Sequence, residues 1–196
     1  MLRYLSILTL LLCSCNSAKK SHPEESQNVV SVSSGPAPSV YLSNQPVNTN
    51  GNLHFSVYYP SCYAEDRKFP VLIFFDPHGS PDIALNKYRG LADKYGFIFL
   101  GSHESKNGNP AQLTADIIDG LSNQARMLPK ADTALIYCGG FSGGGRVAAM
   151  MGLSPVRIEG LLTCGAGVAG GAWFGVPPYV IISMAGTSDM NLQEVK

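Results

Sequence analysis

The chain has 196 residues, of which 45% are hydrophobic and 14% are charged, and this composition is ordinary for a single globular domain. Its 14 basic and 14 acidic side chains cancel, which argues against binding to nucleic acid or to an anionic membrane surface. After the N-terminal segment, no apolar run is long enough to cross a bilayer.

The first 15 residues have the pattern of an export signal. Arg3 precedes the apolar run from Leu5 to Leu12, and the run ends in Leu-Cys-Ser-Cys. This ending is similar to the bacterial lipobox, in which a small residue precedes the cysteine that is lipidated. Cys15 matches that position, so we expect residues 1–15 to be a lipoprotein-type signal peptide and the protein to be exported and anchored to a bacterial membrane. The alternative is an ordinary signal peptide that is cleaved elsewhere.

Residues 16–40 are rich in Ser, Lys, Glu, Asn and Pro and contain few large apolar side chains. Such a segment cannot bury a core of its own, so it predicts a flexible tether ahead of a folded domain at 41–196. If Cys13 is removed and Cys15 is lipidated, the remaining cysteines are at positions 62, 138 and 164. Their odd number and wide spacing predict neither a disulfide framework nor a metal site.

The domain alternates between strand and helix patterns. Strands are predicted at Leu53 to Tyr59, Phe69 to Phe75, Gly96 to Leu100, Ala134 to Cys138, Ile158 to Cys164 and Tyr179 to Met184. Helices are predicted at Ile83 to Tyr95, Pro110 to Met127 and Gly143 to Leu153. Unbroken apolar strands separated by helices are typical of parallel strands buried on both faces. The predicted fold class is therefore α/β, with a mostly parallel sheet and its site at the carboxyl ends of the strands.

The strongest motif is Gly-Phe-Ser-Gly-Gly at residues 140–144, where an apolar strand passes directly into a helix. A serine in such a turn has strained backbone geometry, so the residues two before and two after it must be small, as Gly140 and Gly144 are. The turn lifts the hydroxyl above the sheet, and the helix brings N–H groups to any oxyanion that forms. The motif predicts Ser142 as a nucleophile and the Gly143 N–H as an oxyanion donor.

Two other interpretations of this glycine-rich turn remain open. It could cradle a phosphate or simply end the strand. A dinucleotide site is less favoured, because that fingerprint normally opens the first βαβ unit and needs an acidic residue about 20 positions later.

From Leu53 to Asp189, the order of elements and motifs resembles the α/β-hydrolases, in particular secreted esterases, polyester depolymerases and feruloyl esterases. The resemblance implies a second oxyanion donor in the loop after the first core strand. Relatives usually carry His-Gly where this chain has Asp76 and Pro77. Because proline has no N–H, the donor is expected at His78, with Gly79 next. The alternative is a loop in which His78 only packs.

The resemblance also implies a catalytic acid after a late strand, in the chain order serine, acid, histidine. The segment from Ala185 to Asp189 follows the last predicted strand and is similar to the Gly-x-x-Asp acid loop of the family. Asp189 is the expected acid. The alternative is that it caps a helix starting at Asn191.

The catalytic base is the gap in this pattern. The histidines at positions 22, 54, 78 and 103 all precede Ser142, so none fits the order of the family. The family's histidine follows a further strand, and the sequence ends at Lys196. We therefore expect a C-terminally truncated hydrolase that lacks its last strand and helix, with weak or no turnover.

Taken together, the resemblance implies a carboxylic ester hydrolase that forms an acyl-enzyme on Ser142 and needs no cofactor and no metal. The short link from Gly165 to Pro178, with Trp173 and Phe174, predicts an open cleft for a small-molecule or polymeric ester. A peptidase of the same fold is one alternative. A binding lipoprotein that kept the fold without the activity is the other.

Overall fold

A computed structural model describes residues 39–168 and 177–195. Its strands are β1 (Val40–Val47), β2 (Asn50–Tyr59), β3 (Phe69–Phe75), β4 (Ile98–Ser102), β5 (Ala131–Phe141), β6 (Gly160–Cys164) and β7 (Val180–Met184). Its helices are α2 (Pro81–Tyr95), α3 (Ala111–Met127), α4 (Gly143–Leu153) and α5 (Leu192–Val195). The expected signal peptide with Cys15, almost all of the expected tether, and the aromatics Trp173 and Phe174 lie outside the described residues.

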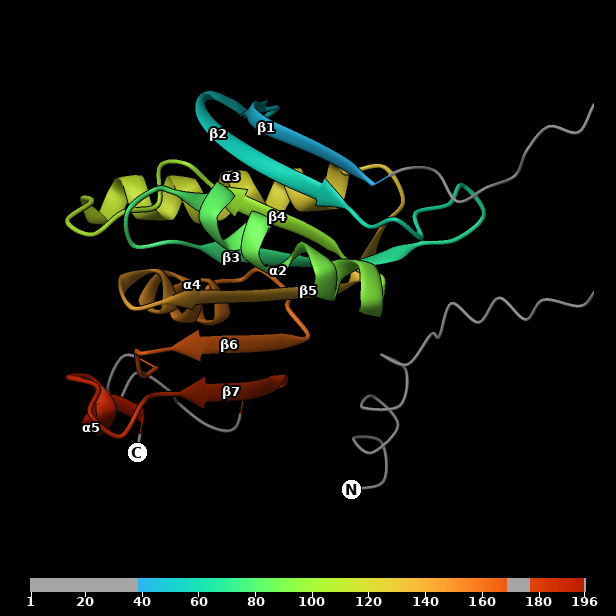
Figure 1. Ribbon diagram of the computed structural model, residues 1–196. Coiled ribbons are helices and arrows are strands. Elements are labelled where there is room, and N and C mark those ends of the chain that lie inside the picture. The colour runs from blue at the N-terminus through green and yellow to red at the C-terminus, as the bar shows by residue number, and fades with distance from the viewer. Residues whose placement is uncertain (1–38, 169–176, 196) are drawn as a thin grey trace, which may run out of the picture.

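The seven strands form one sheet in the order β1-β2-β4-β3-β5-β6-β7 (Figure 1). Strands β4, β3, β5, β6 and β7 pair in parallel, whereas β1 and β2 form an antiparallel edge that joins β4. Because parallel strands need crossovers, helices connect β3 to β4 and β4 to β5. This arrangement confirms the predicted α/β fold class. It brings the carboxyl ends of β3, β5, β6 and β7 to the same edge.

Strand β3 shows how the two faces of the sheet are covered. Val71, Ile73 and Phe75 are fully buried on one face, in a core with residues of α3 and α4. Leu72 and Phe74 point to the opposite face, where they pack beside the residues of α2. Alternating burial along one strand therefore produces two apolar layers, with helices on both faces of the sheet (Figure 1).

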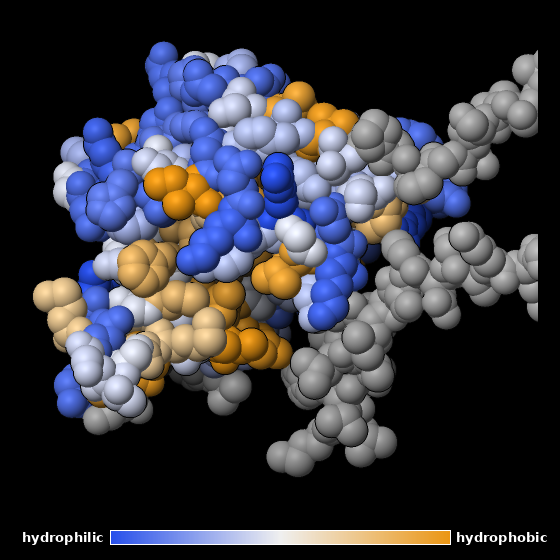
Figure 2. Space-filling view, viewed as in Figure 1, coloured by the Kyte–Doolittle hydropathy of each residue, from blue (hydrophilic) through white to orange (hydrophobic). Residues whose placement is uncertain are grey.

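The face that carries α2 is left partly open beyond that helix. A groove of about 480 Å³ runs there, and its lining includes Leu72, Phe141, Leu162 and Met184. In β7, the edge strand that pairs with β6, the side chain of Ile182 is 54% exposed. Figure 2 shows the apolar side chains gathered over this part of the sheet. An apolar area of this kind favours association with other apolar surfaces.

The Cys138 thiol in the middle of β5 should resist alkylation in the folded protein. Its side chain is fully buried, and burial raises the pKa of the thiol to about 12. Since the thiolate is the reactive form, iodoacetamide should modify Cys138 only when the chain unfolds. Cys62 is partly exposed and serves as the internal control in the same digest. Mass spectrometry that finds Cys138 modified at the same rate as Cys62 under native conditions would contradict this packing.

Among the described residues, no helix is long and apolar enough to span a membrane.

Candidate active site

Ser142 lies between the end of β5 and the start of α4, as the sequence predicts. Its backbone angles are φ 52° and ψ −123°, in a region that residues with a side chain rarely adopt. The Ser142 N–H donates to the carbonyl oxygen of Cys164 at 2.8 Å, and its own carbonyl accepts from Gly145 N at 2.9 Å. These bonds tie the turn to the end of β6 and to the first turn of α4.

The glycines around Ser142 allow three backbone segments to approach closely. A Cβ at Gly144 would lie 1.9 Å from the carbonyl oxygen of Phe75, the last residue of β3. A Cβ at Gly140 would lie 2.3 Å from the backbone carbonyl carbon of Gly144. Only glycine leaves room for these contacts. The turn at Ser142 is therefore pressed against the loop that follows β3.

In the loop after β3, Asp76 organises the backbone. Its Oδ1 accepts hydrogen bonds from His78 N at 2.8 Å and from Ser80 N at 3.2 Å. The His78 ring is largely exposed, with Nδ1 3.7 Å from the same oxygen. The N–H that the resemblance offers as second oxyanion donor is thus occupied by Asp76. The signal for this turn was present in the sequence, because aspartate commonly bonds backbone N–H groups two residues later.

Asp189 lies where the carboxyl ends of β6 and β7 meet. Its Oδ1 accepts a hydrogen bond from Asn191 N at 2.8 Å, just before α5. Its Oδ2 lies 3.0 Å from the Cβ position of Gly165, which follows β6. The Phe141 ring lies 3.3 Å from that same position. Asp189 therefore stabilises a local turn, and its other oxygen lies beside Gly165 at the end of β6.

Asn107 is a residue of this region that the sequence analysis did not identify. Its N–H donates to the carbonyl oxygen of Pro77 at 2.8 Å, which holds the loop after β4 beside the loop after β3. A Cβ at Gly143 would lie only 1.7 Å from Asn107 Oδ1. The carboxamide of Asn107 therefore lies directly against the residue that follows Ser142.

Solved structures with a similar arrangement include three proteins from different organisms. An esterase from Pyrobaculum calidifontis has a TM-score of 0.51 at 14% identity, over 65% of this chain and 44% of its own. Esterase B from Lactobacillus rhamnosis has a TM-score of 0.52 at 16% identity, over 66% of this chain and 50% of its own. The α/β hydrolase GrgF from a Penicillium species has a TM-score of 0.50 at 16% identity, over 65% and 46%.

The chain has the α/β-hydrolase fold. It spans half or less of the length of these solved structures, and at such identities the likeness shows the fold alone. Neither a family model nor a curated protein matches the sequence.

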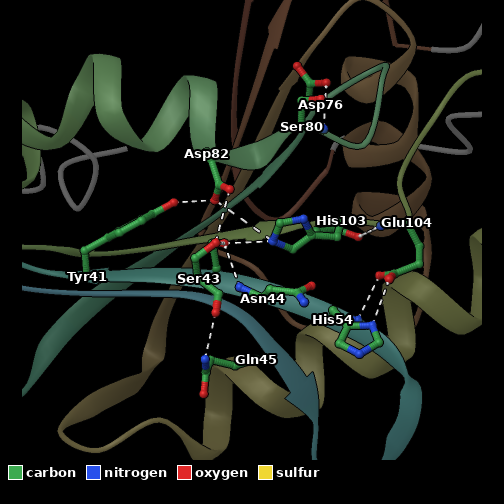
Figure 3. Close-up of polar contacts among 12 residues, drawn as sticks. Tyr41, Ser43, Asn44, Gln45, His54, Asp76, Ser80, Asp82, His103 and Glu104 are labelled. Atoms are coloured by element: carbon green, nitrogen blue, oxygen red, sulfur yellow. Dashed lines mark hydrogen bonds and ion pairs between the residues drawn. The ribbon is translucent and has the colours of Figure 1, made fainter.

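Within this α/β-hydrolase fold, the rings of the described histidines lie beside residues other than Ser142. His54 Nδ1 lies 3.2 Å from Glu104 Oε1, and His103 Nε2 lies 2.8 Å from Ser56 Oγ (Figure 3). His78 faces Asp76, as described above. His22 lies outside the described residues. None of the described histidines is therefore hydrogen-bonded to Ser142, in agreement with their early positions in the chain.

A second contact that was not predicted from the sequence joins the Asp189 loop to α4, the helix that follows Ser142. Arg146 in α4 donates to Glu194 Oε1 at 2.7 Å and to Asn191 Oδ1 at 3.1 Å. Asn191 Nδ2 in turn donates to the carbonyl oxygen of Gly165 at 2.7 Å. The hydrogen bond from Arg146 lowers the pKa of Glu194 below its ordinary value. These bonds fix the loop after β7 against the end of β6 and so hold Asp189 in place.

A polar cluster beside the loop after β3 contains Tyr41, Ser43, Ser56, Asp82 and His103 (Figure 3). The Tyr41 hydroxyl and Ser43 Oγ both donate to the Asp82 carboxylate at the start of α2. Burial acts to raise the pKa of Asp82, but hydrogen bonds from Ser56, Tyr41 and Ser43 and the charge of His103 outweigh it. The pKa of Asp82 is therefore lowered.

Tyr41→Phe is expected to destabilise the protein at neutral pH more than in acid. A carboxyl group with a lowered folded-state pKa contributes stability above its ordinary pKa, and this stability is lost as pH falls through the lowered value. The difference in unfolding free energy between the parent and Tyr41→Phe should therefore shrink below about pH 4. Urea unfolding at several pH values measures it. A difference that is constant from neutral to acid pH would show that Asp82 is not stabilised by Tyr41.

Among residues 39–168 and 177–195, no group of His, Cys, Asp and Glu side chains is arranged to hold a metal ion.

Proposed function

We propose that the protein is a serine hydrolase that cleaves carboxylic esters through an acyl-enzyme on Ser142. The observation that carries this proposal is the backbone of Ser142, a serine with φ 52° at the junction of β5 and α4. Strained residues of this kind cost free energy and persist mainly at functional sites. A simple end to a strand would not require a serine there.

The proposed roles of the residues are supported by their positions at one edge of the sheet. Ser142 Oγ attacks the ester carbonyl carbon, and the N–H of Gly143 at the start of α4 stabilises the oxyanion. Asp189 orients the imidazole of the general base. The described histidines contact other residues, so none of them is assigned as the general base.

The test is covalent labelling of Ser142 by a fluorophosphonate, with imidazole added as a soluble base. Imidazole can accept the serine proton in place of a positioned histidine, so the rate of labelling should rise with its concentration. Ser142→Ala should abolish the modification detected by peptide mass spectrometry. Ser61→Ala, in the loop after β2, is the matched control and should be labelled like the parent.

Two outcomes would contradict the proposed esterase activity. If Ser142 is not labelled at any imidazole concentration, the fold serves binding rather than acyl transfer. If Ser142 is labelled but acyl p-nitroanilides react faster than the matching p-nitrophenyl esters, a peptidase is favoured. Esters are intrinsically easier to cleave than anilides, so a faster reaction with the p-nitrophenyl ester is the result expected for an esterase.

We also propose that the protein is exported and anchored to a bacterial membrane through lipid on Cys15. The support is the apolar run that ends at Cys15 and the polar segment that follows. Incorporation of labelled palmitate in a bacterial host should be lost in Cys15→Ser and kept in Cys62→Ser. Release of the parent protein into the soluble fraction without label would contradict the anchor.

A further inference from the structure

An oxyanion site usually has two hydrogen-bond donors. The Gly143 N–H at the start of α4 is one of them. The N–H of His78, which the resemblance offers as the other, donates to Asp76 Oδ1 at 2.8 Å. The same carboxylate oxygen also accepts a hydrogen bond from Ser80 N, so two hydrogen bonds to Asp76 hold this turn. Using the His78 N–H for the oxyanion would require breaking a charge-assisted hydrogen bond.

Backbone contacts hold Asn107 beside the loop that follows β3. Its N–H donates to the Pro77 carbonyl oxygen, and the neighbouring residues Lys106 and His78 form an antiparallel bridge. The close contact between Gly79 and the His103 carbonyl oxygen presses the same two loops together. The position of the Asn107 backbone is therefore fixed relative to the loop after β3, although the Asn107 side chain is exposed.

The side chain of Asn107 points at the nucleophile turn. The position of a Cβ on Gly143 would lie 1.7 Å from its Oδ1 and 3.4 Å from its Nδ2. No hydrogen bond within the described part of the chain engages the carboxamide of Asn107. A half-turn about χ2 exchanges the two ends of a carboxamide, so its NH₂ group can face the space beside Gly143.

We propose that the Asn107 carboxamide is the second oxyanion donor of this site, an inference that rests on the proposed function of Ser142. When Ser142 Oγ bonds to the ester carbonyl carbon, the C=O π electrons move to the oxygen. The Gly143 N–H and Asn107 Nδ2–H donate to this oxyanion. The serine proton passes to an imidazole base, and the C–O bond to the alcohol breaks when the tetrahedral intermediate collapses. The alcohol leaves with that proton.

The experiment measures imidazole-supported acylation of Ser142 by a p-nitrophenyl ester. Removing one side-chain oxyanion donor typically costs about 10²–10³-fold in kcat, and Asn107→Ala should show a loss of this order with KM little changed. Asn107→Asp keeps the shape and the oxygen but removes the NH₂ group, so it should lose at least as much. Lys106→Ala, exposed in the same loop, should retain the parent rate.

A second variant perturbs the same contact from the other side. Gly143→Ala keeps the backbone N–H but places a methyl group where the Asn107 carboxamide lies, so it should reproduce most of the loss. In the double variant with Asn107→Ala, the two losses should not add, since both remove one interaction. Additive losses would overturn the assignment.

Failure of this inference is distinguishable from failure of the proposed function. If Ser142 is phosphonylated and acylated in the parent and Asn107→Ala reacts at the same rate, only the role of Asn107 is overturned. If Ser142 is never modified, both proposals fall. Thermal unfolding of Asn107→Asp should match the parent, and a large fall in its unfolding temperature would indicate a structural role instead.

Discussion

Replacing Gly144 by alanine should destabilise the protein by roughly 3 kcal/mol or more, the upper part of the range for single substitutions. The added Cβ would lie 1.9 Å from the carbonyl oxygen of Phe75 and 2.5 Å from its carbonyl carbon. Both contacts are with backbone, so no side-chain rotation can relieve them. Either α4 must move away from β3 or the end of β3 must move, and each breaks packing in a fully buried layer.

Urea unfolding followed by circular dichroism measures this loss, with Gly90→Ala as the matched control. Gly90 is in the exposed middle of α2, and a Cβ there would meet nothing within 4 Å. Alanine at a helical position is more favourable than glycine by about 1 kcal/mol, so this variant should be stabilised. If Gly144→Ala unfolds at the parent urea concentration, the close approach of α4 to β3 is not present in solution.

The same substitution tests how the site depends on the fold. The contact between Gly144 and Phe75 sets the spacing between the Ser142 turn and the Asp76 loop. A protein that still folds with alanine at 144 should therefore label more slowly at Ser142, because a displacement of about 1 Å can cost 10²-fold in rate. Stability and reactivity are coupled here through one backbone contact.

The central layers of the fold could be predicted from the sequence because they depend on local pattern. The apolar run of β3 was predicted with its observed bounds, Phe69–Phe75, and the β5–Ser142–α4 junction was predicted at the correct residues. Strand β5 is longer than the apolar segment from 134 to 138, since pairing with β3 and β6 extends it to Ala131–Phe141.

Strand β1 shows where pattern is insufficient. Its sequence contains Pro46 and has Asn44 with positive φ, and most of its side chains are exposed. It is a strand because its backbone pairs with β2, with register shifts on both sides of the Gln45–Pro46 segment. Edge strands tolerate such residues because one side of their backbone has no partner strand. A property that depends on the partner strand is not readable from β1 alone.

The site shows the same division between local and distant contacts. The turn at Ser142 is encoded by neighbouring glycines and was predicted. The engagement of His78 N–H by Asp76 was also local, but the resemblance to hydrolases with His-Gly at that place favoured a different role. The approach of Asn107 to Gly143 joins the loop after β4 to the start of α4, which are far apart in sequence, and no short motif marks it.

Ser142→Gly should remove the nucleophile and at the same time stabilise the protein. A serine at φ 52° and ψ −123° carries strain of roughly 1–3 kcal/mol, and glycine adopts this region without it. The greater freedom of glycine in the unfolded chain offsets about 0.5–1 kcal/mol of that gain. The expected net result is an increase of roughly 1 kcal/mol in unfolding free energy, together with complete loss of fluorophosphonate labelling.

Ser142→Ala and Asn44→Gly are the control variants, and their unfolding free energies are compared with that of Ser142→Gly. Alanine also lacks the hydroxyl but keeps the Cβ, so it should abolish labelling without the gain in stability. Asn44 has the same φ of 52°, but asparagine adopts positive φ more readily than other residues with a side chain, so glycine should gain little there. If Ser142→Gly is no more stable than Ser142→Ala, the turn stores no strain. A gain confined to position 142 would instead show that the protein gives up stability to present a hydroxyl above the sheet, a cost that only function explains.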